Sequence, residues 1–331
     1  MAKYKIKHIT HYFYNSPVYE SINQIMLYPI QDLHQTLHFQ SIRITDSPSI
    51  EVFKDHYFNQ LGVFNILKPH SELSIQSNIV VEVIPIEEPV LEISPSEQWK
   101  EIENLKNDFT LKDFLEIEDF DYKKEITEVV NSLVDKGKPV FENAFNISKY
   151  IFENFTYKQG VTTIETNIDE IWSLKAGVCQ DFAHLLLEML QIVGLPSRYV
   201  SGYICPKNHD LRGEGATHAW VEVFLPTYGW IGIDPTNNCL VSDRHVRLAV
   251  GKDFHDCTPV KGIYKGNLEH RLEVTVVVEN TDSHISAIYN DFFSDRVEKP
   301  SFVSINEIPE TVENNNSYWR HMQMQQQQQQ Q

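Results

Sequence analysis

Gly177-Val178-Cys179-Gln180-Asp181-Phe182-Ala183-His184 is the stretch of this 331-residue chain that says most about its fold. Apolar residues follow with the 3.6-residue spacing of a buried helix, at Phe182, Leu186, Met189 and Val193. Gly194 then ends the helix, and Pro196 prevents its restarting. The stretch therefore predicts a sharp turn, then a helix whose first turn carries a cysteine.

A cysteine in that place is a candidate nucleophile. The unpaired N–H groups and the dipole at a helix N-terminus favour an anion, so a thiol there tends to lose its proton. The same N–H groups could receive a developing oxyanion. The alternative is a buried Cys179 that packs as a small hydrophobe.

Length and charge limit the classes of protein to consider. A chain of 331 residues exceeds the usual size of one hydrophobic core, so two domains are expected. Lysine and arginine total 28 against 46 acidic residues, which gives a formal net charge of -18. That balance disfavours a nucleic acid or an anionic membrane surface as partner.

Location is predicted from the start of the chain and from its cysteines. Met1 to Tyr14 alternates polar and apolar residues, without a signal-peptide core, and no later stretch approaches ~18 uninterrupted apolar residues. The four cysteines show no C-x-x-C spacing, which favours free thiols in a reducing compartment. These features predict a cytoplasmic protein.

Hydrophobic periodicity divides the chain into four parts. Residues 1–90 contain short alternating segments separated by turn-forming groups such as Asn15-Ser16-Pro17, which predicts an antiparallel β-sandwich. Residues 91–121 are expected to be a linker with helical segments. Residues 122–280 form the predicted second domain, and the acidic, Gln-ended tail at 281–331 is predicted to be largely disordered.

The second domain changes from helical to strand periodicity along its length. Helices are expected at 122–135, 139–155 and 168–175, before the one that starts at Cys179. Strands are expected at 198–205, 217–225, 230–234 and 271–278. Helices followed by an antiparallel sheet predict an α+β domain.

A base and its orienting acceptor are predicted at one end of a hairpin. His218 begins one strand, and Asp234-Pro235 ends the next after the loop Pro226-Thr227-Tyr228-Gly229. A three-residue loop with left-handed Gly229 would put both side chains on one face, about 7–8 Å apart between β-carbons. A four-residue loop without a bulge would put them on opposite faces.

Each of these signals alone has a structural explanation. A histidine at a strand start is more often structural, and Asp-Pro after a strand is commonly a turn. Four other residues could be drawn as a zinc site, namely Cys239, His245, His255 and Cys257. Their spacing matches no zinc-finger or zinc-knuckle pattern, so no metal site is predicted.

Four ordered motifs of the chain resemble the bacterial transglutaminase-like superfamily. They are 177–184, 194–203, 217–223 and 229–236, within a core match at roughly residues 140–250. The β-rich start also looks like the N-terminal domain that often precedes this core, through His8, His11-Tyr12-Phe13-Tyr14 and Pro17-Val18.

The resemblance implies a papain-like α+β fold with a Cys-His-Asp triad and no cofactor. By position, Cys179 would be the nucleophile, His218 the general base and then acid, and Asp234 the orienting acceptor. The Cys179 N–H should be one oxyanion donor. The second donor is not clearly marked; Tyr157 is the candidate, with simple packing as its alternative role.

The predicted function is thiol-dependent acyl transfer on peptide or isopeptide amides of a peptide or protein substrate. Hydrolysis, as in a cysteine peptidase or amidase, is preferred because water is always present. Two alternatives stay open: a protein-glutamine transglutaminase with an amine acceptor, and a non-catalytic module that holds a peptide in its cleft.

Overall fold

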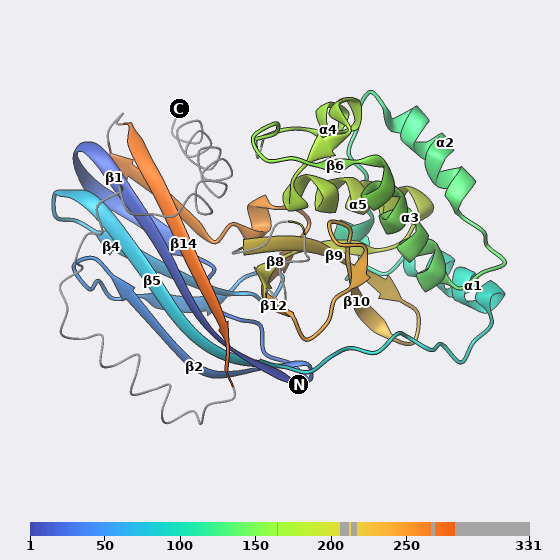
Figure 1. The fold of residues 1–331 in the computed structure, drawn as a ribbon, viewed down its shortest axis with the longest axis horizontal. Helices are drawn as coiled ribbons and strands as arrows, with labels where there is room; N and C mark the ends of the chain where they lie inside the picture. Colours follow the sequence, from blue (N-terminus) through green and yellow to red (C-terminus); the bar gives the residue numbers. More distant parts are fainter. Residues whose placement is uncertain (164, 206–211, 213–216, 266–268, 282–331) are drawn as a thin grey trace.

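Strand β1 (Ala2–Ile25) is the centre of a seven-stranded antiparallel sheet (Figure 1). The computed structural model describes residues 1–163, 165–205, 212, 217–265 and 269–281. The sheet also contains β2 (Gln35–Ile44), β3 (Glu51–Lys54), β4 (Gln60–Ile66), β5 (His70–Val83), β13 (Val260–Lys265) and β14 (His270–Asn280). Alternate residues of β1 from Tyr4 to Tyr12 are buried, so the period-two pattern places one face on the core.

The N-terminal strands form one curled sheet instead of the two packed layers of a sandwich. The first half of β1 pairs with β5 and β14, and its second half pairs with β4 and β13. Its register with β5 shifts between Phe13 and Val18. The predicted turn at Asn15-Ser16-Pro17 therefore lies inside one long strand that bends, and the predicted antiparallel β class is confirmed.

Residues 271–278 were expected in the sheet of the second domain, and that expectation is wrong. They belong to β14, which pairs with β1 from Tyr4 opposite Asn280 to Tyr14 opposite His270. Figure 1 shows the two strands side by side. Alternation in the sequence predicts a strand, but it carries no information on the partner of that strand.

Helices make up most of the segment between the two sheets. They are α1 (Pro95–Leu105), the 3₁₀ turn η1 (Lys112–Leu115), α2 (Lys123–Leu133), α3 (Val140–Asn154), α4 (Ile168–Leu174) and α5 (Cys179–Val193). Helix α1 starts with a capping box between Ser94 and Glu97, within the predicted linker. Helix α5 ends at Gly194, whose φ of 86° suits glycine.

A five-stranded antiparallel sheet follows α5, with the strand order β11-β10-β9-β8-β12. Its strands are β8 (Ser197–Ile204), β9 (Thr217–Leu225), β10 (Gly229–Asp234), β11 (Cys239–Leu240) and β12 (His245–Gly251). The short strands β6 (Thr156–Tyr157) and β7 (Ala176–Gly177) pair in parallel, and the 3₁₀ turn η2 (His255–Cys257) follows β12. Helix α5 packs on β8 and β9, so the α+β class is confirmed.

Buried polar contacts join the two sheets. His8 Nδ1 lies 2.9 Å from the Tyr203 hydroxyl, and burial lowers the pKa of His8 to about 4. Asn59 donates to the Val250 carbonyl at 2.7 Å and accepts from the Val250 N–H at 2.8 Å. Because both links are buried, the orientation of the five-stranded sheet depends on the curled one.

Two predictions from the sequence are left to compare with the structure: a largely disordered tail, and a chain without a membrane-spanning segment. Within the predicted tail at 281–331, residues from 282 onward lie outside the described residues. Across the described part of the chain, no helix has the length and apolar character needed to cross a membrane.

Candidate active site

Cys179 is the first residue of α5, directly after β7. Its side chain is buried and is a free thiol. The preceding turn is fixed by Asp181, whose Oδ2 accepts from the Val178 N–H at 2.7 Å. Gly177 makes this turn possible, because an added β-carbon would lie 2.5 Å from Asp181 Oδ2.

Asp181 is also held from the segment before α4. Thr162 donates its hydroxyl hydrogen to Asp181 Oδ2 at 2.6 Å. Burial raises the pKa of Asp181 to about 6, although these two hydrogen bonds work in the opposite direction. Asp181 therefore acts as a structural link that holds the cysteine turn against its neighbouring loop.

The hairpin of β9 and β10 has the three-residue loop that the sequence analysis required. Gly229 pairs with Leu225 and has a φ of 99°, and Ile233 pairs with Val221. One further step along this register puts Asp234 opposite Trp220, two residues from His218. The odd register thus places both predicted side chains on one face of the sheet.

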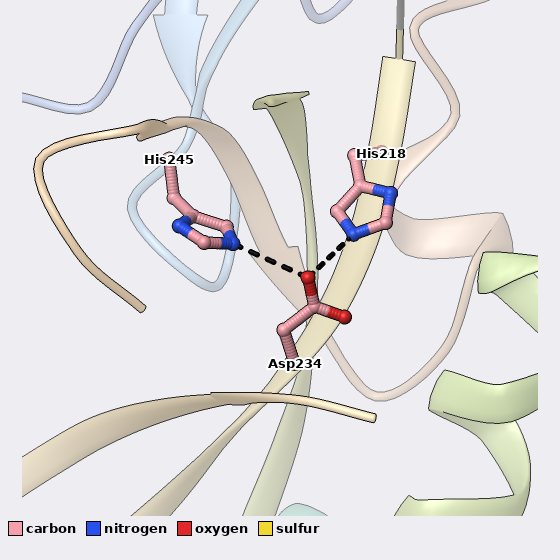
Figure 2. A group of neighbouring side chains, drawn as sticks. All are labelled: His218, Asp234 and His245. Carbon is pink, nitrogen blue, oxygen red and sulfur yellow. Dashed lines mark hydrogen bonds and ion pairs between the residues drawn. The ribbon is translucent and has the colours of Figure 1, made fainter. Parts of the chain in front are cut away.

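His218 and Asp234 meet as a fully buried pair (Figure 2). His218 Nε2 lies 2.8 Å from Asp234 Oδ2. With Nε2–H as the donor, Nδ1 is the nitrogen left for the Cys179 thiol. This Nδ1 is buried, and no nitrogen or oxygen atom in the described part of the chain bonds to it, which leaves it to the thiol of Cys179, a hydrogen-bond partner of His218. Burial alone would lower the pKa of His218, but Asp234 and then Cys179 outweigh it and raise that pKa well above its ordinary value.

Asp234 receives hydrogen bonds on both oxygens. Its Oδ1 accepts from the N–H groups of Thr236 at 2.9 Å and of Asn237 at 3.2 Å. Its Oδ2 accepts from the Asn237 side-chain amide at 2.8 Å, in addition to His218. Burial would raise the pKa of Asp234, but its two histidine neighbours outweigh burial and lower it strongly. The carboxylate is therefore charged and held in one orientation.

His245, from the start of β12, is the second of those histidines. Figure 2 shows its ring pointing at the same oxygen of Asp234 as His218, with Nε2 3.3 Å from Asp234 Oδ2. Its Nδ1 accepts from the Ser242 N–H at 3.2 Å, so Nε2 carries the proton that is donated to Asp234. Burial, against the effect of Asp234, lowers the pKa of His245 and keeps this ring neutral.

The roles of His245 and Asn237 were not predicted from the sequence. A signal existed for Asn237, because Asp commonly accepts from the backbone two and three residues ahead. For His245 no comparable signal existed, since its position depends on the pairing of β12 with β8.

Cys239, His245, His255 and Cys257, the four residues considered for a zinc site, do not come together in the structure. His245 binds Asp234, and Cys257 is buried with its thiol 3.9 Å from the Tyr199 carbonyl. Among the described residues, a different group has ligand-type atoms close enough for one metal ion, namely His218, Asp234 and His245. The two short contacts within that group are the hydrogen bonds from His218 and from His245 to Asp234 Oδ2.

Tyr157 lies beside the cysteine turn. Its strand β6 pairs with β7, which places Tyr157 opposite Gly177. Its ring makes an edge contact with Phe182 at 6.3 Å between centroids. Burial, followed by the charge of Cys179, raises the pKa of Tyr157, while a hydrogen bond with the Gln159 side chain lowers it, so the hydroxyl stays protonated and keeps its O–H donor.

Three large aromatic residues of the five-stranded sheet make contacts within the protein interior. Trp220 packs with Val200, Val241 and Val250 in a separate buried cluster. Tyr203 bonds His8, and the Arg198 guanidinium lies 4.2 Å above the Trp230 ring.

Comparison with known proteins shows that the chain belongs to the transglutaminase-like superfamily. Residues 127–235 match the model of that superfamily, and residues 4–82 match the bacterial transglutaminase-like N-terminal region. An uncharacterized protein of Mycobacterium tuberculosis is 32% identical over 83% of this chain and 92% of its own length. The recognition made from the sequence motifs is therefore confirmed.

Two further relatives carry functional names. A protein-glutamine gamma-glutamyltransferase of Pseudomonas aeruginosa is 32% identical, over 25% of this chain and 13% of its own length. The crystal structure of a proposed cysteine protease from Cytophaga hutchinsonii superposes with a TM-score of 0.67 at 20% identity. That superposition covers 86% of this chain and 92% of the other, and it confirms the fold.

Proposed function

We propose that this protein is an enzyme of thiol-dependent acyl transfer on peptide or isopeptide amides. The observation that carries the proposal is the buried 2.8 Å pair of His218 and Asp234, whose remaining imidazole nitrogen is left for the thiol at the start of α5. A nucleophile, a base and an orienting acceptor are the three parts that such catalysis needs.

The reaction begins with proton transfer from the Cys179 thiol to His218 Nδ1. The thiolate attacks the amide carbonyl and forms a C–S bond, and the imidazolium returns its proton to the nitrogen as the C–N bond breaks. An amine leaves, and a thioester remains on Cys179. Water, deprotonated by His218, then attacks the thioester, which releases a carboxylic acid and restores the thiol.

The negative charge that develops on the carbonyl oxygen during the attack has to be stabilised by hydrogen-bond donors. The Cys179 N–H is at the first position of α5, where backbone N–H groups have no partner within the helix. The protonated Tyr157 hydroxyl, beside β7, is the proposed second donor.

Hydrolysis is the preferred outcome for the thioester, as a cysteine peptidase or amidase performs it. Transamidation to a lysine-type amine is the second candidate, supported by the name of the Pseudomonas aeruginosa relative. A cytoplasmic location is part of the proposal and is supported by four free thiols.

The test combines thiol labelling with a two-product assay. Iodoacetamide should modify Cys179 faster at neutral pH than a model thiol, and the Cys179→Ala protein should lose all turnover. The matched control is Cys239→Ala, a partly buried cysteine on β11, which should keep wild-type turnover.

A glutamine peptide with a labelled primary amine then separates the two outcomes. Release of ammonia without incorporation of the label supports hydrolysis, whereas incorporation above hydrolysis supports transamidation. Labelling of Cys179 no faster than a model thiol, with no turnover of any peptide amide, would contradict the enzyme proposal and favour a peptide-binding module.

A further inference from the structure

A cavity of about 500 Å³ lies beside α5, on a different face of this helix from Cys179. At 100° per residue, Glu188 lies about 180° around the helix from Cys179. The walls come from α5, residues 116–119, residues 165–168 and residues 252–255. A cavity of this volume holds a small organic ligand.

Six of the fifteen residues that line the cavity are acidic, namely Glu116, Glu118, Asp119, Glu165, Glu188 and Asp253. Two of them lie close to a basic side chain of the same lining. Lys252 Nζ donates to Glu116 Oε2 at 2.6 Å, and His255 Nδ1 lies 3.6 Å from Asp253 Oδ1. The lining contains more acidic than basic side chains, which favours a cationic ligand.

Glu188 is the acid of this cavity whose burial needs an explanation. Its side chain is only 6% exposed, and its Oε2 is buried without a hydrogen-bond partner in the part of the chain that the structure describes. The Glu118 N–H supports the carboxyl group by a hydrogen bond. Leaving a buried polar atom unpaired costs free energy, which a ligand that donates a hydrogen bond would recover.

We propose that this cavity binds a primary alkylammonium group, from a free polyamine or from a lysine side chain of a peptide, with Glu188 as its carboxylate partner. An ammonium group supplies a positive charge and N–H donors to Glu188 Oε2, which has no donor among the described residues. Ile117, Ile168 and Leu187 give the cavity apolar wall surface that suits the methylene chain.

A bare divalent ion fits the cavity less well. A metal ion needs several ligand atoms that converge on one point. Among the described residues, the group that meets this condition is His218, Asp234 and His245, and none of these lines the cavity.

Binding should be coupled to the ionisation of Glu188. Burial, followed by the charge of Glu118, raises the pKa of Glu188 to about 7, while Lys123 lowers it. The other titratable groups that face the cavity are Glu116, Asp119, Glu165, His184, Lys252, Asp253 and His255. An ammonium group stabilises the carboxylate, so affinity should rise as pH increases through about 7 and binding below that pH should release a proton.

The test is calorimetric titration of the full chain with 1,5-diaminopentane and with Nα-acetyl-lysine methylamide. We expect saturable binding of at least one of the two at pH 8, and weakening of about tenfold or more in Glu188→Gln. Gln mimics the neutral form that burial favours, so this variant should fold. Glu103→Gln, at an exposed position of α1 outside the cavity, should bind like the wild type.

Two further arms separate the cavity from the active site and identify the source of the amine. Cys179→Ala should bind the amines as well as the wild type does, because the proposal is independent of acyl transfer. Similar affinity for both probes supports a peptide lysine, whereas preference for the diamine supports a polyamine. Absence of saturable binding, equal binding by Glu188→Gln, equal binding of uncharged 1,5-pentanediol, or calcium binding that displaces the amines would each overturn the proposal.

Discussion

Asp234 and Glu188 are two buried carboxyl groups of the same domain with opposite surroundings. Both oxygens of Asp234 accept hydrogen bonds, from two histidines, Asn237 and Thr236. Glu188 has an oxygen without a hydrogen-bond partner among the described residues, and another acid, Glu118, lies nearby. Burial opposes ionisation at both sites, yet the pKa of Asp234 is lowered and that of Glu188 is raised to about 7.

The difference shows that hydrogen-bond donors and neighbouring charges can outweigh burial at Asp234, whereas burial prevails at Glu188. Hydrogen bonds from charged or polar donors replace the lost hydration of Asp234, so it stays ionised. At Glu188 hydration is lost without full replacement, so the pKa is raised and the proton is held up to about pH 7. The donors around Asp234 suit a carboxylate that stays charged and orients His218. The incomplete hydrogen bonding of Glu188 suits a site that binds a ligand.

The largest expected effect comes from removing the charge of Asp234. Asp234→Asn keeps the shape of the side chain but should lower kcat/KM about 10³-fold or more, as loss of a triad carboxylate does. Because Asp234 raises the pKa of His218, the alkaline limb of the pH–rate profile should also move to lower pH. Asp243→Asn, a partly buried acid in the next loop, is the matched control. Activity within tenfold of wild type and an unmoved limb would contradict the assigned role.

The next effect is on stability and concerns Glu188. Its folded pKa lies above its ordinary value of 4.5, so the stability due to its bound proton is full below pH 4.5 and is lost as pH rises through about 7. Glu188→Gln should therefore raise the free energy of unfolding by roughly 2–3 kcal/mol at pH 8 and by little at pH 4.5. Urea unfolding at both pH values measures this, and a pH-independent difference would disprove it.

The smallest effect is expected at His245, which we interpret as a positioning residue. Its removal in His245→Ala leaves Oδ2 of Asp234 with one donor fewer and should cost about 1–2 kcal/mol of stability. We expect kcat to fall about tenfold with little change in KM. Asp234 would then interact more strongly with His218, so the alkaline limb should move to higher pH, opposite to its shift in Asp234→Asn.

A conservative variant separates positioning from simple packing at this residue. His245→Gln offers an N–H donor and should recover part of the lost activity. Equal kcat and an unchanged pH profile in both variants would show that His245 only fills space beside Trp220, whose ring it meets edge-on at 5.2 Å between centroids.

Local signals in the sequence predicted much of the candidate site. The helix at Cys179 follows from apolar spacing and from Gly194, and the meeting of His218 with Asp234 follows from a hairpin register that Gly229 makes possible. These features depend on residues close together in the chain. Local periodicity is sufficient to predict such features.

The features that were missed depend on pairing between distant segments. His245 reaches Asp234 because β12 pairs with β8, about 40 residues earlier. Glu188 looks like an ordinary polar residue of an amphipathic helix until the segment 116–119 and the turn after β12 cover it. Similarly, nothing local to 260–280 shows that β13 and β14 complete the sheet begun by β1.

The place of β14 beside β1 has a consequence for biosynthesis. A ribosome makes β1 first and β14 some 250 residues later, so one edge of β1 stays unpaired while the intervening helices and strands emerge. An open strand edge invites association with other chains. Nascent chains that stop before residue 270 should therefore recruit holdase chaperones, and release of the completed polypeptide should end that dependence.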